Sequence, residues 1–291
     1  MIYLHDIDPV ALALGPLKVH WYGLMYLAGF GAAWWLGIHR IRARRMPGID
    51  DQAFADLLFN AMLGVVVGGR LGYMFFYALH DWLAQPLLIF QIWQGGMSFH
   101  GGLLGVLIAI GWWAYRYPVK IADVVDFIAP LVPPGLCFGR VGNFIGGELW
   151  GKFTHSHWGV IFPRAPELER MPMEQIRFAY SHGMLDRFAR HPSQLYEALL
   201  EGAVLFTVLY FASLRPQPRY RISGIFALLY GVFRIVIEFF RVPDHGIYVA
   251  FGWLTKGQLL SVPLIIVGCA LLILSRRSPT IAAGKPLESL P

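Results

Sequence analysis

A glycine-rich run at the end of an apolar stretch carries three polar side chains that are suited to binding a substrate. Arg140, Asn143 and Glu148 lie in the string Phe138-Gly-Arg-Val-Gly-Asn-Phe-Ile-Gly-Gly-Glu-Leu-Trp-Gly151. An ionised arginine at lipid depth costs about 2.5 to 3.5 kcal/mol on insertion scales, so it normally faces a partner, a cavity or a bound ligand. This run is therefore the first candidate for a functional site.

A second polar series lies on one face of a predicted helix nearer the C-terminus. Tyr230, Arg234, Glu238 and Arg241 are spaced four, four and three residues apart, which places them on one helical face. Glu238 is expected to pair with Arg234 or Arg241, and Arg241, near the helix end, is expected to extend toward lipid headgroups. The guanidinium groups of Arg140 and Arg234 match the oxygens of a phosphodiester, and a phospholipid is the anion most available at this depth.

Three further candidates lie in the outer parts of predicted helices: Tyr22, Arg70 and His100. His100 has glycines on both sides in Gly95-Gly-Met-Ser-Phe-His-Gly-Gly102, so its backbone can approach a ligand closely, and the N–H groups of a helix start suit an anion. For Arg70, a structural ion pair and a ligand contact both remain open. Three glycines around Arg70 have the four-residue spacing of close helix packing: Gly64, Gly68 and Gly72.

The composition is that of a membrane protein. Of the 291 residues, 56% are hydrophobic, 15% aromatic and only 14% charged, and the mean hydropathy is +0.52; soluble domains rarely look like this. The net charge of +6 is scattered between apolar segments, which argues against nucleic-acid binding. Cys137 and Cys269 lie far apart in apolar runs, so neither a disulfide framework nor a metal site is expected. The N-terminus lacks the basic and small-residue pattern of a cleavable signal peptide.

Seven stretches are long enough to cross the hydrocarbon core as helices, which takes roughly 20 residues. They lie near residues 19–38, 57–79, 97–114, 124–145, 194–213, 222–241 and 257–275. Pro130, Pro133 and Pro134 predict a kink or a break in the fourth. The predicted fold is an all-α integral membrane protein, a seven-helix transmembrane bundle with one small external domain. Its parts are spans one to four with an external N-terminus (1–146), a polar head region (147–192), and spans five to seven with a cytoplasmic C-terminus (193–291).

The distribution of lysine and arginine predicts the orientation. The short segments after spans one, three, five and seven hold twelve basic residues, whereas the opposite short segments hold only Lys18 and Lys256. Because basic residues favour the cytoplasmic side, the N-terminus is predicted outside and the C-terminus inside. At about 1.5 Å per helical residue, the polar candidates all reach the outer leaflet.

Five strings resemble the bacterial prolipoprotein diacylglyceryl transferases. Two are the strings around Arg140 and His100 given above. The other three are His20-Trp-Tyr-Gly-Leu-Met-Tyr26, His191-Pro-Ser-Gln-Leu-Tyr-Glu197 and Tyr230-Gly-Val-Phe-Arg-Ile-Val-Ile-Glu-Phe-Phe-Arg241. They follow the family order over nearly the whole chain. The resemblance implies an enzyme of the bacterial inner membrane that moves the diacylglyceryl group of phosphatidylglycerol to the lipobox cysteine of a preprotein. A thioether forms and glycerol phosphate leaves, in the first step of lipoprotein maturation.

The candidate residues fit this chemistry. A thiol is mostly protonated at neutral pH, so His100 is the candidate base or thiol-orienting group. Arg140 and Arg234 are assigned to the developing charge of the leaving phosphate. The remaining candidates are assigned to substrate binding or orientation: Tyr22, Arg70, Asn143, Glu148, Tyr230, Glu238 and Arg241. No cofactor or metal is implied, the partners are phosphatidylglycerol, lipobox preproteins and membrane lipids, and a monomer is expected.

Two other classes of protein remain open. A transporter also needs intramembrane charges, but its site is expected near the midplane between repeated halves, and no repeat is visible here. An intramembrane serine protease would need a nucleophile and a base. Ser98 and His100 are close in sequence but lack the G-x-S-x-G elbow. Within the transferase hypothesis, both protein cysteines are expected to be dispensable, because the substrate thiol attacks directly.

Overall fold

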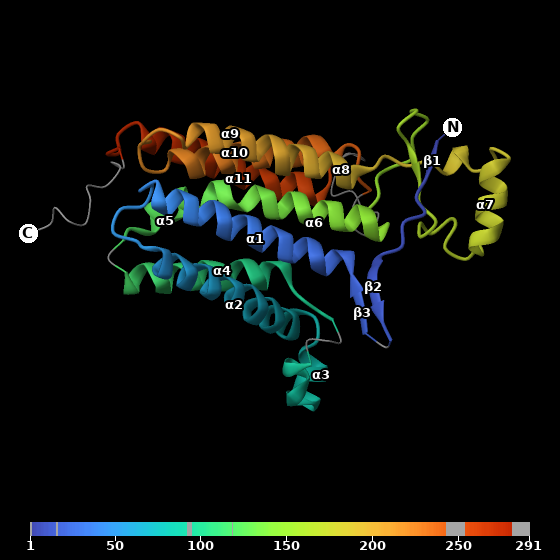
Figure 1. The fold of residues 1–291 in the computed structure, drawn as a ribbon, viewed down its shortest axis with the longest axis horizontal. Coiled ribbons are helices and arrows are strands. Elements are labelled where there is room, and N and C mark those ends of the chain that lie inside the picture. The colour runs from blue at the N-terminus through green and yellow to red at the C-terminus, as the bar shows by residue number, and fades with distance from the viewer. Residues whose placement is uncertain (1, 16, 92–94, 118, 243–253, 281–291) are drawn as a thin grey trace, which may run out of the picture. The chain divides into compact units, whose positions relative to one another are not determined.

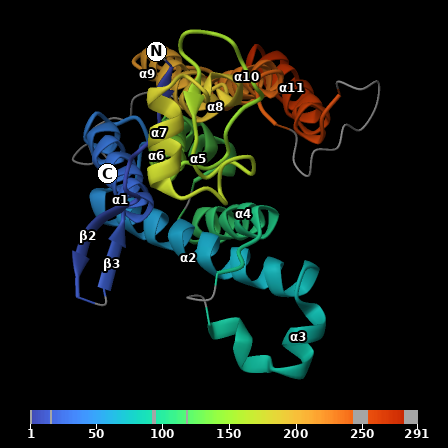
Figure 2. The same ribbon diagram turned by 90° about the vertical axis from the view of Figure 1, so that its right-hand side faces the viewer.

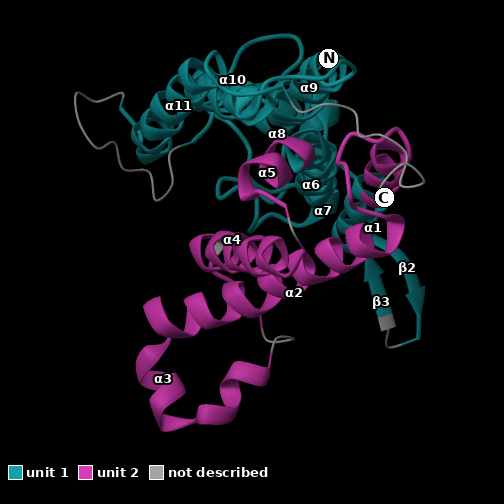
Figure 3. Ribbon diagram, turned by 90° about the vertical axis from the view of Figure 1, so that its left-hand side faces the viewer, with its two compact units in different colours: residues 1–33, 128–280 teal, residues 34–127, 281–291 magenta. Residues whose placement is uncertain are grey.

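The computed structural model describes residues 2–15, 17–91, 95–117, 119–242 and 254–280. The described chain is mainly helical and forms two compact units (Figure 3). Unit 1 combines Met1–Ala33 with Ile128–Thr280, and unit 2 is built from Trp34–Phe127.

Four helical stretches in the described chain have the length and apolar composition needed to cross a membrane. They are Asp51–Phe76, Ile121–Gly146, Ser193–Ala212 and Lys256–Ser275. Three more helices have 18 residues or more: α1 (Trp21–Arg42), α4 (Phe99–Arg116) and α10 (Arg221–Glu238). These seven segments overlap the seven stretches expected from the sequence, but only the first four meet the composition of a span.

Unit 2 is built on two long helices that pack side by side through glycines (Figure 2). They are α2 (Asp51–Phe76) and α4, which run in opposite directions. A β-carbon at Gly68 would lie 2.4 Å from the carbonyl oxygen of Gly101, and one at Gly105 would lie 2.0 Å from that of Gly64. No side chain fits in either place, so the predicted packing role of the glycines is confirmed. The short helix α3 (Leu79–Ala84) and a 3-10 turn, Pro86–Phe90, follow α2.

The fourth expected span is interrupted by a 3-10 turn at Pro130, where the sequence predicts a kink or a break. Helix α5 (Ile121–Ile128) ends in a 3-10 turn, Ala129–Leu131, before α6 (Val132–Gly146) begins. Proline has no N–H to donate, so Pro130 is accommodated at the start of the 3-10 turn, and Pro133 at the start of α6.

In unit 1, the helix after the head region changes its winding. Helix α8 (Ser193–Glu197) continues into a π-helix, Ala198–Val204, and then into α9 (Leu205–Ala212). The π-helix packs against α6, where a β-carbon at Gly202 would lie 2.5 Å from the Cβ of Cys137. Helix α10 packs along α11 (Lys256–Ser275). Figure 1 shows α6, α9, α10 and α11 in this unit, with α7 and β1 at one end of it.

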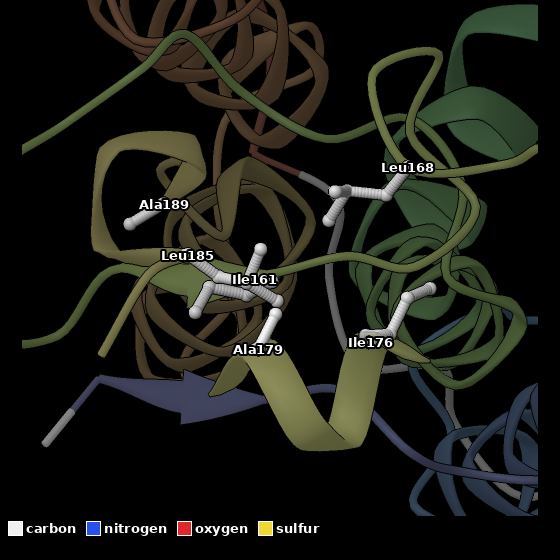
Figure 4. Packing of buried hydrophobic residues seen from close by; sticks show 6 residues of the cluster. All are labelled: Ile161, Leu168, Ile176, Ala179, Leu185 and Ala189. Atoms are coloured by element: carbon white, nitrogen blue, oxygen red, sulfur yellow. The ribbon is translucent and has the colours of Figure 1, made fainter. Parts of the chain in front are cut away.

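The head region has its own small core. Strand β1 (Tyr3–Leu4) pairs in parallel with β4 (Val160–Ile161), and α7 (Met173–Ser181) covers them. Figure 4 shows the buried cluster, whose members are Ile161, Leu168, Ile176, Ala179, Leu185 and Ala189. A second pair, the antiparallel strands β2 (Val10–Leu14) and β3 (Leu17–His20), precedes α1.

The structure is mainly helical, as predicted, but the prediction did not include these four short strands. They are two to five residues long, too short for a period of two to stand out in the sequence. The partner of β1 is also more than 150 residues away, so nothing local indicates the pairing.

Candidate active site

The candidate site of unit 1 is organised around one buried glutamate. Glu197 is 1% exposed and accepts contacts from three guanidinium groups. Its Oε2 lies 2.8 Å from Nε of Arg140, and its Oε1 lies 2.7 Å from Arg234 and 3.2 Å from Arg241. A carboxylate held by several charge-assisted hydrogen bonds fixes the direction of each guanidinium.

Three chain segments deliver this cluster. Arg140 comes from α6, Glu197 ends α8, and Arg234 lies on α10, with Arg241 three residues beyond that helix. The predicted helical face is confirmed by the ion pair between Arg234 and Glu238, which is 2.9 Å long. Glu238 also accepts a hydrogen bond of 2.9 Å from the hydroxyl of Thr255, at the start of α11.

The expectation that Arg241 reaches for lipid headgroups is wrong. Its side chain is 11% exposed and donates to Glu197. The chain after α10 is also fixed, because Lys152 N–H donates to the carbonyl of Phe240. A buried carboxylate within reach outweighs snorkelling, since an unpaired buried charge is costly.

Glu201 is a second buried acid that the sequence reasoning missed. It lies in the π-helix, is 0% exposed, and its Oε1 is 3.8 Å from a terminal nitrogen of Arg234. Glu197 entered the sequence-based prediction only as the last residue of the string His191-Pro-Ser-Gln-Leu-Tyr-Glu197, with no assigned role. The sequence does contain an indication of this site. Glu197 and Glu201 are two acids four residues apart inside an apolar span, and this spacing places them on the same face of a helix.

The terminal nitrogens of Arg140 are the open part of the cluster. Arg140 uses Nε to hold Glu197, and no further partner of its side chain is found among the described residues. The side chain is 21% exposed, more than that of Arg234 at 14%. Arg234, by contrast, places one terminal nitrogen on Glu197 and the other on Glu238. Arg140 therefore presents a planar pair of donors to an incoming anion.

The glycine-rich run after Arg140 folds back on itself. Gly147 adopts a left-handed conformation, with a φ of 66°, that ends α6. This turn lets the amide of Asn143 donate to the Glu148 carboxylate over 2.8 Å. Gln194 donates to the backbone carbonyl of Glu148, which ties the turn to α8.

Two tyrosines border the cluster. Tyr22 packs over Gly142 of α6, where a β-carbon would lie 3.2 Å from its ring. Its hydroxyl lies 3.1 Å from that of Tyr26, and Arg140 and Glu148 are both within electrostatic range of it. Tyr230, one helical turn before Arg234, is within the same range of the charged cluster. Both tyrosines thus lie close enough to the cluster to interact electrostatically with its charges.

Three chain segments come together where the cluster meets the head region, at Gly151, His191 and Phe240. Gly151 N–H donates to the carbonyl of His191, and a β-carbon at Gly151 would lie 2.6 Å from that oxygen and from the carbonyl oxygen of Phe240. Only glycine fits at this position. Burial lowers the pKa of His191, whose Nδ1 lies 3.1 Å from the hydroxyl of Tyr196.

In unit 2, Arg70 is a structural residue, and the ligand-contact interpretation is not supported. It is 5% exposed, and its five N–H groups donate to five backbone carbonyls. These belong to Leu88, Ile89, Gln91, Gly95 and Gly96. The guanidinium thus ties the segment after α3 to α2 and has no donor left for a substrate.

His100 is an exposed residue in the first turn of α4, also in unit 2. The preceding Ser98 is 6% exposed and caps this helix, because its hydroxyl accepts from the N–H of Gly101 over 3.2 Å. A buried capping hydroxyl does not fit the protease hypothesis. Gly101 packs against the backbone of α2. Its missing side chain therefore serves the contact between the two helices and not the close approach of a ligand.

The described part of the chain holds no group of three or more histidine, cysteine, aspartate or glutamate residues able to bind a metal ion. The cluster around Glu197 consists of arginine donors and glutamate acceptors.

Comparison with known proteins decides between the open classes. A model of the prolipoprotein diacylglyceryl transferase family matches residues 9–274. The chain belongs to the prolipoprotein diacylglyceryl transferase family. It is 63% identical to a phosphatidylglycerol–prolipoprotein diacylglyceryl transferase of Xylella fastidiosa (strain M23), covering 97% of each chain. Similar proteins of the same name are 64% identical in Xanthomonas campestris pv. campestris (strain B100; 98% and 97% covered) and 62% in Xanthomonas axonopodis pv. citri (strain 306; 99% and 98%).

Proposed function

We propose that this chain transfers the diacylglyceryl group of phosphatidylglycerol to the thiol of a prolipoprotein's lipobox cysteine, and that the cluster around Glu197 holds the lipid phosphate. The family and its named relatives support the reaction. The observation that carries the binding site is the convergence of Arg140, Arg234 and Arg241 on one buried carboxylate, with the terminal nitrogens of Arg140 still open.

Arg140 binds two phosphate oxygens through these nitrogens, in the bidentate geometry that suits guanidinium groups. Arg234 adds a fixed charge beside it, because Glu197 and Glu238 hold both of its terminal nitrogens. Preorganised cations of this kind lower the barrier where negative charge grows in the transition state.

The reaction is a displacement at the glycerol carbon that bears the phosphate. The sulfur of the lipobox cysteine forms the C–S bond while the C–O bond to phosphate breaks, and the electron pair leaves with glycerol phosphate. The thiol proton passes to a base. His100 takes this role, or orients the thiol while the departing phosphate takes the proton. Asn143, Glu148, Tyr22 and Tyr230 then shape the headgroup site.

The protein is proposed to cross the bacterial inner membrane seven times, with α1, α4 and α10 added to the four helical stretches of sufficient apolar character. The N-terminus and the head region lie outside, and the C-terminus lies in the cytoplasm, because basic residues favour the cytoplasmic side. The ends of α6 and α10 and the start of α8 meet beside the head region. This arrangement supports a site in the outer leaflet. The active form is a monomer.

Reporter fusions test the orientation. Fusions after Arg45 and Lys285 should both report the cytoplasm, and a fusion at Arg170 should report the exterior; Lys285 lies outside the described residues. An external signal at Arg45 would contradict both the orientation and the outer-leaflet site.

The activity is tested with purified enzyme, labelled phosphatidylglycerol and a lipobox peptide, with thioether-linked lipid as the product measured. Arg140→Lys should lower kcat/KM about a hundredfold. The lysine ammonium is a point charge that replaces the two parallel donors of the guanidinium, and removing one preorganised donor from an active site lowers the rate by about this factor. Arg170→Lys, on the exposed head region, is the matched control and should retain activity. If Arg140→Lys transferred lipid as fast as this control, the proposal that Arg140 binds phosphate through both terminal nitrogens would be contradicted.

A further inference from the structure

Glu201 is the buried acid that the proposed reaction does not use. It is 0% exposed, and neither carboxylate oxygen has a hydrogen-bond partner among the described residues. Glu197, four residues earlier, is buried to the same degree but accepts contacts from three arginines. A buried carboxylate without donors is costly as an anion and much less costly as a neutral acid.

The groups packed around Glu201 do not supply the missing donor. Arg234 lies beside Glu201, but its terminal nitrogen is 3.8 Å from Glu201 and only 2.7 Å from Glu197. Its other terminal nitrogen is held by Glu238. The remaining titratable or charged groups near Glu201 are Arg140 and Cys137 on α6, Tyr230 on α10 and Arg241 beyond α10. Helix α9 contributes no charged residue.

The balance of charge around Glu197 indicates what a proton on Glu201 would achieve. The cluster holds three arginines, and it holds three glutamates, which are Glu197, Glu201 and Glu238. With all six ionised, the net charge is zero and an anionic lipid gains no net attraction. With Glu201 neutral, the cluster carries one positive charge, which matches the single negative charge of a phosphodiester.

We propose that Glu201 is protonated in the resting enzyme and that this neutral acid gives the arginine cluster its net charge for an anionic phosphodiester headgroup. Glu201 is a positioning residue in this scheme, because it acts through Arg234 and not on the lipid itself. The π-helix supports the role, since this winding is rare and is frequent at functional sites. The proposal rests on the phosphate site proposed above and names the charge state that this site needs.

Infrared difference spectroscopy on the whole enzyme in lipid tests the protonation directly. Wild type minus Glu201→Gln at neutral pH should show the C=O stretch of a protonated carboxylic acid, and wild type minus Glu174→Gln, an exposed control on α7, should not. If Glu201→Gln does not fold, Glu201→Asp should shift the same band. A wild type without a band assignable to Glu201 would overturn the proposal, whatever the transferase activity.

The second measurement is the KM for phosphatidylglycerol against pH. Raising the pH ionises Glu201 and removes one net positive charge from the cluster. The wild-type KM should therefore rise by about tenfold at alkaline pH, which is the change in affinity expected from one nearby charge in a partly screened site. Glu201→Gln should lose this rise. An identical alkaline rise in Glu201→Gln would overturn the assigned charge role. A Glu201 band in an enzyme that transfers no lipid would instead leave the protonation standing and contradict the proposed function.

Discussion

The network around Glu197 predicts a large loss of stability when its charge is removed. In Glu197→Gln the side chain keeps its shape, but one oxygen acceptor becomes an NH2 donor that faces guanidinium groups. Arg140, Arg234 and Arg241 then lose their shared anion while remaining 21%, 14% and 11% exposed. Removing one partner of a buried ion pair costs about 3 to 5 kcal/mol, because the remaining charge is left uncompensated.

The assay is reversible unfolding in mixed micelles, followed by circular dichroism. Asp6→Asn is the matched control, because Asp6 also accepts from an arginine, Arg177, at 2.7 Å, but both of these side chains are exposed, at 44% and 62%. A pair that reaches solvent is worth about 1 kcal/mol or less. Glu197→Gln should therefore lower the free energy of unfolding by at least about 2 kcal/mol more than the control. Equal losses in the two variants would refute the idea that Glu197 is the centre of the network.

Three further predictions follow from other parts of the molecule. Arg70→Lys should lower the melting temperature and expose residues 86–91 to protease, because a lysine offers three donors where five carbonyls are now bound. Unchanged cleavage would contradict the proposal that Arg70 holds this segment against α2. His100→Asn should abolish the basic limb of the pH–rate profile if the imidazole is the base, and retain that limb with moderately reduced activity if it only orients the thiol. The double variant Cys137→Ala/Cys269→Ala should retain transfer, and wild type given labelled phosphatidylglycerol without peptide should carry no covalent label; loss of transfer together with a labelled enzyme would show a lipidated intermediate.

Features that depend on regular spacing could be predicted from the sequence. The pairing of Arg234 with Glu238 follows from a four-residue step on a helix. The close contact of α2 with α4 follows from the spacing of Gly64 and Gly68, and the break before α6 follows from Pro130. In each case a local rule and the packing agree.

Features that depend on long-range contacts could not be predicted. The partners of Glu197 come from residues up to 57 positions away, and no spacing rule indicates which of several arginines will reach it. The structural role of Arg70 could not be predicted, because its five acceptors are backbone carbonyls, which every sequence contains. The π-helix after Glu197 has no signature in an apolar run of this kind.

The most direct test of the phosphate site measures the separation of guanidinium nitrogen and lipid phosphorus. Enzyme with 15N-labelled arginine is reconstituted with phosphatidylglycerol, and 15N–31P dipolar dephasing is compared between wild type and Arg140→Lys. A bidentate contact, with nitrogen about 2.7 to 2.9 Å from the phosphate oxygen, gives strong dephasing in the wild type. We expect this contribution to disappear in Arg140→Lys and to persist in the Arg170→Lys control. Equal dephasing in wild type and Arg140→Lys would contradict the assignment of the phosphate to Arg140.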